Sequence, residues 1–119
     1  MNPTTVGVIG CGYWGPNLLR NFVELPDVEV VAIADLDEGR RAAMTRRYPW
    51  LVATPHYQDF FGLPIQAAVI ATPPPTHYAL AKDCLEHGLH VLVEKPITLN
   101  VRDAEHLNEL AERQGLVLM

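Results

Sequence analysis

Three glycines with the spacing Gly-x-Gly-x-x-Gly constrain this chain more than any other feature of its sequence. They are Gly10, Gly12 and Gly15, and they follow an apolar, β-branched run at residues 6–9 that is typical of a buried parallel strand. Residues 13–23 then carry apolar side chains at helical spacing. A glycine triplet between a strand and a helix predicts a loop whose backbone N–H groups face a bound anion.

Each glycine of the triplet has its own steric reason. Gly10 permits the tight turn after the strand, Gly12 lets a pyrophosphate approach the backbone, and Gly15 lets the helix pack closely on the strand. Asp35 ends the second apolar run about 20 residues further on, where a carboxylate can accept hydrogen bonds from both hydroxyls of an adenosine ribose. The combination predicts a dinucleotide-binding loop.

Charges near Asp35 bear on which dinucleotide would bind. Asp35 and Asp37 would repel a 2′-phosphate, which favours NAD over NADP. Arg40 and Arg41 stand close behind in the sequence and weaken that preference. Enzymes that bind S-adenosylmethionine use a similar loop and a similar carboxylate, so the residues alone predict dinucleotide or adenosyl binding rather than hydride transfer.

Strands and helices alternate along the whole chain. Further strands are expected at residues 28–34, 51–53, 67–71, 89–93 and 116–119. Helices are expected to begin after Asp37, Thr76 and Asn100, each a residue suited to an N-cap, and to end near residue 47, at Gly88 and at Gly115. This pattern predicts an α/β fold, a doubly wound and mainly parallel six-stranded sheet with helices on both faces.

Composition limits the possible functions. A chain of 119 residues that is 49% hydrophobic and 19% charged fits one domain, spanning 1–119. Its net charge of −5 and scattered basic residues disfavour nucleic acid, and no apolar run approaches the roughly 20 residues that span a bilayer. Two distant cysteines, Cys11 and Cys84, and no leader-like start predict a cytoplasmic protein. The apolar end at 115–119 predicts that the chain is cut short.

Two further turns fall where strands end. Residues 71–77 contain Thr72, Pro73 and His77 around three consecutive prolines, and Glu94-Lys95-Pro96 follows the fifth expected strand. The carboxyl edge of a parallel sheet is where ligands bind in open α/β folds. A lysine held there beside a nicotinamide could exchange a proton with a substrate hydroxyl as hydride leaves its carbon.

Together, the glycine loop, the strand that ends in Asp35, the Thr72-Pro73 turn and the Glu94-Lys95 turn resemble the nucleotide-binding half of the Gfo/Idh/MocA oxidoreductases. This family, named for glucose–fructose oxidoreductase and inositol dehydrogenase, has a Rossmann fold, and the resemblance covers essentially all of the chain. It implies an NAD(P)-dependent dehydrogenase acting on a sugar, cyclitol or nucleotide-sugar hydroxyl.

The resemblance also assigns roles to residues. Lys95 would be the catalytic proton-transfer residue, and Glu94 would approach the nicotinamide ribose. The cofactor-binding set would be Gly10, Gly12, Tyr13, Trp14, Gly15, Asp35, Thr72, Pro73, His77 and Glu94. Family members continue into a second domain with the substrate contacts and, usually, the homo-oligomer interface. No such domain is present here, so we expect NAD binding without useful turnover.

Other interpretations remain open at this stage. A non-catalytic module that senses NAD would share the same loop, and a methyltransferase that binds S-adenosylmethionine would share it too but leaves the Glu94-Lys95 turn unexplained. His87 and His90 lie three residues apart but are separated by a helix-ending glycine, so no metal site is expected. His106 is expected to face solvent on the last helix, and Phe60 and Phe61 are expected in the core.

Overall fold

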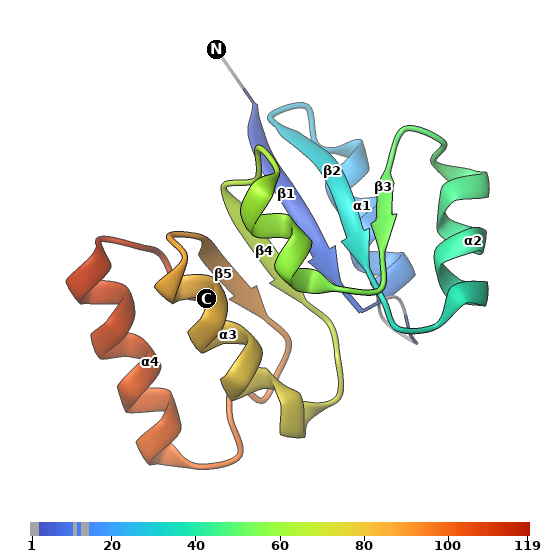
Figure 1. The fold of residues 1–119 in the computed structure, drawn as a ribbon. Helices are drawn as coiled ribbons and strands as arrows, with labels where there is room; N and C mark the ends of the chain where they lie inside the picture. Colours follow the sequence, from blue (N-terminus) through green and yellow to red (C-terminus); the bar gives the residue numbers. More distant parts are fainter. Residues whose placement is uncertain (1–2, 11, 13–14) are drawn as a thin grey trace.

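A parallel sheet forms the centre of the molecule (Figure 1). The computed structural model describes residues 3–10, 12 and 15–119. The strands are β1 (Thr4–Ile9), β2 (Val28–Ala34), β3 (Val52–Thr54), β4 (Ala67–Ile70) and β5 (His90–Val93). They are ordered β3-β2-β1-β4-β5, and every neighbouring pair is parallel. The predicted doubly wound α/β class is confirmed.

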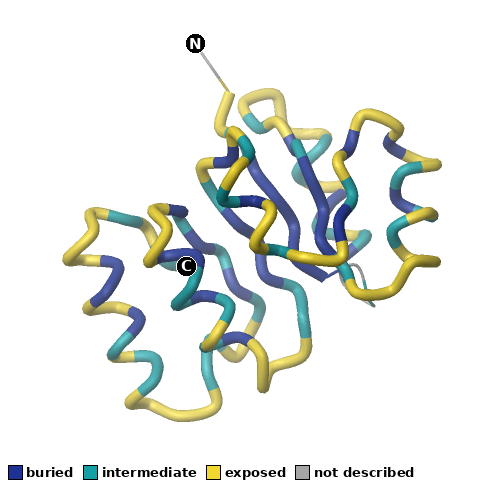
Figure 2. The backbone as a smooth tube through the Cα atoms, in the orientation of Figure 1, coloured by how far each residue is buried: buried dark blue, intermediate teal, exposed yellow. Residues whose placement is uncertain are grey.

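In the described part of the chain, four α-helices connect and cover these strands. They are α1 (Gly15–Glu24), α2 (Glu38–Arg47), α3 (His77–Glu86) and α4 (Val101–Gln114), with short 3₁₀ turns η1 (Tyr57–Gly62) and η2 (Pro74–Thr76). The buried residues form two clusters, one containing Leu19 of α1 and Met44 of α2, the other Leu85 of α3 and Leu107 of α4. Since Val69 belongs to the first cluster and its neighbours on β4 to the second, the two clusters lie on opposite faces of the sheet. Figure 2 shows the buried strands between these layers.

The predicted helix ends follow from local chemistry. The Asp37 side chain accepts a hydrogen bond from the backbone N–H of the residue three positions on and begins α2. Asn100 caps α4 in the same way. Gly88 and Gly115 follow α3 and α4 with φ of +83° and +66°, a left-handed backbone that glycine adopts without a Cβ clash.

The sixth strand is a correction to the sequence prediction. Within the described residues the sheet has five strands, because residues 116–119 form only an isolated parallel bridge between Val91 and Leu118. Backbone hydrogen bonds from Val91 to Val117 and from Val93 to Met119 hold this segment beside β5. The segment therefore lies where a sixth strand was expected without reaching a strand's length.

The stretch at residues 54–64, which the sequence leaves unreadable, packs against the sheet through one aromatic ring. Phe60 in η1 is completely buried. A Cβ on Gly7 of β1 would lie 2.5 Å from the Phe60 Cε2 atom, so the ring occupies the space that a side chain at position 7 would need. Phe61, by contrast, is only partly buried and stacks on His87 with ring centroids 3.8 Å apart.

Candidate functional site

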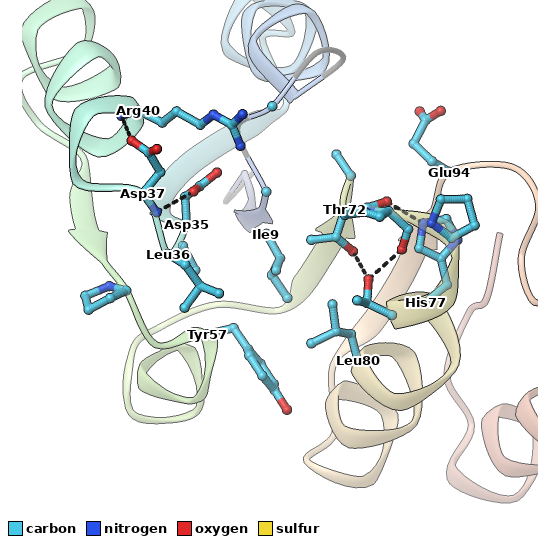
Figure 3. A pocket seen from close by; sticks show the side chains of 18 of the residues that line it. Ile9, Asp35, Leu36, Asp37, Arg40, Tyr57, Thr72, His77, Leu80 and Glu94 are labelled. Atoms are coloured by element: carbon cyan, nitrogen blue, oxygen red, sulfur yellow. Dashed lines mark hydrogen bonds between the residues drawn. The ribbon is translucent and has the colours of Figure 1, made fainter.

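A cavity of about 970 Å³ opens at the carboxyl edge of the sheet (Figure 3). Residues that follow each of the five strands line it, from Gly10 after β1 to Lys95 after β5. The strand order reverses between β1 and β4, which is the point where open parallel sheets form a ligand crevice. The cavity is of the size usual for small-molecule sites.

Most of the predicted site residues meet at this cavity. Those that line it are Gly10, Gly12, Asp35, Thr72, Pro73, His77, Glu94 and Lys95. Gly15 is buried and begins α1. The predictions for Tyr13 and Trp14, and for Cys11 within the loop, fall outside the described residues. The fold thus gathers residues from turns as far apart as positions 10 and 95.

Gly10 is required by the backbone at the end of β1. Its φ is +95°, and its N–H donates to the Ala34 carbonyl oxygen at 2.7 Å. A Cβ at this position would lie 2.9 Å from the Ala71 carbonyl oxygen and 2.9 Å from Thr72 Cγ2. Both the conformation and the close approach of the β4 turn exclude a side chain there.

The space beside the Gly12 Cα atom is open, in contrast to that at Gly10. A Cβ on it would meet only the Arg40 guanidinium, whose Nη1 would be 3.6 Å away. Arg40 extends from the start of α2 toward the glycine loop, as Figure 3 shows. The backbone at Gly12 is therefore open to a ligand, with a positive charge beside it, which suits an anion such as pyrophosphate.

Asp35 is held at the end of β2 by several hydrogen bonds. Its N–H donates to the Thr54 carbonyl oxygen at 3.0 Å, and its Oδ1 accepts from the Asp37 N–H at 2.8 Å. The Arg41 Nη1 donates to the Asp35 carbonyl oxygen at 2.8 Å, so Arg41 supports the strand end, whereas Arg40 reaches the cavity. The adjacent Leu36 is 86% exposed and also lines the cavity.

The turn after β4 is closed by its own hydroxyl groups. The Thr76 hydroxyl donates to the Pro73 carbonyl oxygen at 2.6 Å, and the Thr72 and Thr76 Oγ1 atoms lie 2.6 Å apart. Thr76 was expected to cap α3 through its side chain, but its oxygen accepts no such bond, because Thr76 ends η2 with a helical backbone (φ −92°, ψ −12°) instead of the extended backbone of a capping residue. Because the single hydroxyl proton of Thr76 goes to Pro73, Thr72 donates to Thr76, and this chain of bonds shapes the wall of the cavity.

The turn after β5 carries Glu94 and Lys95 and contains a cis peptide bond between Lys95 and Pro96. The Glu94 N–H donates to the Ile70 carbonyl oxygen at 3.0 Å, which continues the pairing of β4 with β5. The Lys95 side chain is exposed, and Glu94 is half-buried. Both residues line the cavity, and Figure 3 shows Glu94 on the side opposite Asp35.

Sequence reasoning missed the wall that η1 and α3 contribute. Tyr57 lines the cavity, and its hydroxyl donates to the Asp83 Oδ2 at 2.6 Å. Burial, together with the hydrogen bond to Asp83 and its charge, raises the pKa of Tyr57 above its usual value of 10.0, so the phenol stays neutral. Leu80 adds an apolar surface beside it. Only the aromatic content of residues 54–64 hinted at this wall.

His106 is also placed differently from its prediction. It is partly buried rather than facing solvent, and its Nδ1 lies 2.6 Å from the Tyr78 hydroxyl, which joins α4 to α3. Among the described residues, no group of three His, Cys, Asp or Glu side chains could hold a metal ion. No helix in that part of the chain is both long and apolar enough to cross a bilayer.

A family comparison matches this geometry. The family model named GFO_IDH_MocA, described as an oxidoreductase family with an NAD-binding Rossmann fold, matches residues 4–119. The chain belongs to this family. Membership confirms the resemblance to the Gfo/Idh/MocA oxidoreductases that the sequence shows.

Individual relatives in the Gfo/Idh/MocA family give the match more detail. Inositol 2-dehydrogenase from Rubrobacter xylanophilus is 37% identical over 119 residues, which cover 96% of this chain and 33% of the relative. The structure of the 3-ketoreductase KijD10 from Actinomadura kijaniata, solved with NADP and TDP-benzene, has a TM-score of 0.92 at 32% identity, covering 99% of this chain and 37% of that one. The structure of GenD2 from gentamicin A biosynthesis, solved with NAD, has a TM-score of 0.94 at 28% identity, with coverage of 99% and 34%. The chain spans about a third of the length of the curated relatives it matches.

Proposed function

We propose that this chain is the NAD-binding part of a dehydrogenase that interconverts an alcohol and a ketone on a sugar-like substrate. The observation that carries the proposal is the single cavity lined by the glycine loop, by Asp35 and by Lys95. Three separate turns meet there. The glycine backbone could bind the phosphates of a nicotinamide dinucleotide, the carboxylate could bind its ribose, and the lysine could transfer a proton beside its nicotinamide.

The adenosine end of the cofactor would lie beside β2. The Asp35 carboxylate would accept hydrogen bonds from the ribose hydroxyls, and the exposed Leu36 would pack on the adenine. Asp35 and Asp37 favour NAD, because a 2′-phosphate would bring further negative charge to two carboxylates. Arg40 is the residue that could offset this repulsion, since its guanidinium reaches the cavity.

The nicotinamide end would lie beside Lys95 and the Thr72-Pro73 turn. When bound, the cofactor supplies the carbon that exchanges a hydride with the substrate. Lys95 lies at the cavity edge with an exposed side chain, where its Nζ would donate a proton to, or take one from, the substrate oxygen. The neutral Tyr57 phenol and Leu80 also line the same cavity, where a flat ring would pack against them.

A sugar, cyclitol or nucleotide-linked sugar is the substrate class we propose. Support comes from relatives that act on inositol or were solved with a TDP compound. The chain covers about a third of those relatives, so we also propose that substrate contacts and the oligomer interface belong to sequence outside these 119 residues. We expect the 119-residue chain to bind cofactor without turning over substrate.

Calorimetric titration with NADH, NADPH and S-adenosylmethionine tests the proposal. We expect the chain to bind NADH most tightly and Asp35→Ala to weaken this binding by about tenfold to a hundredfold, the value of hydrogen bonds to a charged group. Asp27→Ala is the matched control, because Asp27 is exposed and does not line the cavity. Arg40→Ala should lower NADPH affinity more than NADH affinity. Absence of binding to a folded chain would refute the proposed function, as would equal effects of the two aspartate variants.

A further inference from the structure

We propose that His77 is a positioning residue that ties together the two turns at the nicotinamide end and so holds Lys95 in place. The inference rests on the proposed function, because it concerns the same cavity. His77 begins α3, directly after the Thr72–Thr76 turn, and reaches across to the turn that follows β5 (Figure 3). The His77 side chain thus contacts its own turn and also Pro96, which lies 19 residues further along the sequence.

The surroundings of His77 are unusual for a residue in a ligand site. Only 1% of its surface is exposed. Its Nδ1 lies 2.7 Å from the Pro96 carbonyl oxygen, and its Nε2 lies 2.7 Å from the Thr72 carbonyl oxygen. Carbonyl oxygens only accept hydrogen bonds, so the neutral ring satisfies one of them and the protonated ring satisfies both. Both ring nitrogens are committed to backbone, which leaves neither for direct contact with a cofactor.

The bond to Pro96 matters because of where Lys95 stands. The residue before Lys95 is fixed by the hydrogen bond from the Glu94 N–H to the Ile70 carbonyl oxygen at 3.0 Å. The residue after it is fixed by His77. Lys95 is therefore held on both sides by its backbone neighbours while its own side chain remains exposed. Loss of the second anchor would free the turn that aims the amine into the cavity.

The bond to Thr72 extends the same effect to the opposite wall. The Thr72 carbonyl oxygen faces the His77 Nε2, and the Thr72 hydroxyl joins the Thr76 hydroxyl, which in turn donates to the Pro73 carbonyl oxygen. One imidazole thereby sets the distance between the turn after β4 and the turn after β5. Both ring nitrogens of His77 face the turns after β4 and β5, and neither faces Asp35 or the described glycines of the loop, so the adenosine end should not depend on this ring.

This geometry predicts an effect confined to half of the cofactor. The comparison is between NADH and ADP-ribose, which keeps the adenosine and pyrophosphate but lacks the nicotinamide. His77→Ala should lower NADH affinity about tenfold while leaving ADP-ribose affinity within about twofold of the starting protein. Excess imidazole, which can refill the space and place a ring nitrogen beside each carbonyl oxygen, should restore NADH binding. A purely structural role would weaken both ligands together.

The experiment combines these titrations with amide hydrogen exchange. In His77→Ala, exchange should rise at the Thr72 and Thr76 amides and at the non-proline amides of residues 94–98, and it should stay unchanged in β1 and β2. Imidazole should reverse the rise. Glu86→Ala, at an exposed position at the other end of α3 and outside the cavity lining, is the control and should leave binding and exchange at these turns unaltered. His77→Gln, which can donate to one carbonyl but not span both, provides a second variant and should give an intermediate result.

The outcomes separate this inference from the proposed function. If the unmodified chain fails to bind NADH, the proposed function fails, while the exchange data still decide whether His77 ties the turns together. If NADH binds but His77→Ala and His77→Gln change NADH and ADP-ribose affinity equally, the positioning role is wrong and the function stands. Unchanged exchange at residues 94–98 in both variants would also overturn the inference.

Discussion

Replacement of Gly10 by alanine tests whether the turn at the end of β1 has the strict backbone requirement that the structure gives it. The residue has φ of +95°, and an added Cβ would lie 2.9 Å from both the Ala71 carbonyl oxygen and Thr72 Cγ2. A left-handed backbone costs a residue with a Cβ about 1–2 kcal/mol. Forcing a methyl group into a packed contact costs about 1–3 kcal/mol more.

Gly10→Ala should therefore lower the free energy of unfolding by about 2–5 kcal/mol in total. Gly88→Ala is the matched control: Gly88 has a similar φ of +83°, but nothing lies within 4 Å of its added Cβ. We expect Gly88→Ala to lower the free energy of unfolding by only about 1–2 kcal/mol, which is the cost of the left-handed backbone without a steric clash. The difference between the two variants isolates the clash with the turn after β4.

Urea unfolding followed by far-ultraviolet circular dichroism measures both variants, and NADH titration of the folded proteins follows. Gly10→Ala should also weaken NADH binding, because it displaces Thr72, whereas Gly88→Ala should not. Combining Gly10→Ala with Thr72→Ser removes the Cγ2 contact and keeps the hydroxyl, so part of the loss should be recovered. Losses that agree within about 0.5 kcal/mol for Gly10→Ala and Gly88→Ala would refute the reasoning.

Three further predictions concern the frame around the site. Asn100→Ala should lower the free energy of unfolding by about 1 kcal/mol, because the Asn100 Oδ1 caps α4 through a hydrogen bond of 2.9 Å. Asn108→Ala, on the exposed side of that helix, should leave the free energy of unfolding unchanged. Chemical denaturation measures both variants, and equal losses would contradict the capping role. Burial, with a smaller contribution from a neighbouring carboxylate, raises the pKa of the Cys84 thiol from 9.0 to about 12. Because the folded-state pKa lies above the unfolded one, the stability contributed by the neutral thiol is fully present below pH 9.0 and is lost as pH rises toward 12. Between about pH 8 and about pH 10, the free energy of unfolding of the parent chain should fall by about 1.4 kcal/mol more than that of Cys84→Ala. If the free energy of unfolding changes with pH equally in both proteins, the pKa of the thiol is not raised by folding. Finally, Gly7→Ala should lower the free energy of unfolding by about 1–3 kcal/mol, because the added Cβ would lie 2.5 Å from the Phe60 Cε2 atom. Phe60→Leu in the same chain should recover part of that loss. Strictly additive effects in a double-mutant cycle would refute this contact.

Features with a local physical cause could be predicted from the order of the residues alone. The caps at Asp37 and Asn100 and the helix ends at Gly88 and Gly115 follow from groups within a few residues of one another, so the pattern contains all that is needed. The parallel α/β sheet likewise follows from alternating strand and helix periodicity, because strands separated by helices require crossover connections. The expected sixth strand, by contrast, was wrong, because an apolar run of the right length does not ensure continuous pairing with β5.

Contacts between residues that are distant in the sequence became evident only in the folded molecule. Nothing near His77 in the sequence indicates that its ring bonds Pro96 as well as Thr72, since that depends on how α3 packs against β4 and β5. The pairing of His106 with Tyr78 arises in the same way, from the packing of α4 on α3. Side-chain type and spacing therefore predict which turns reach the carboxyl edge of the sheet, whereas the partner of each side chain depends on the arrangement of whole helices and strands.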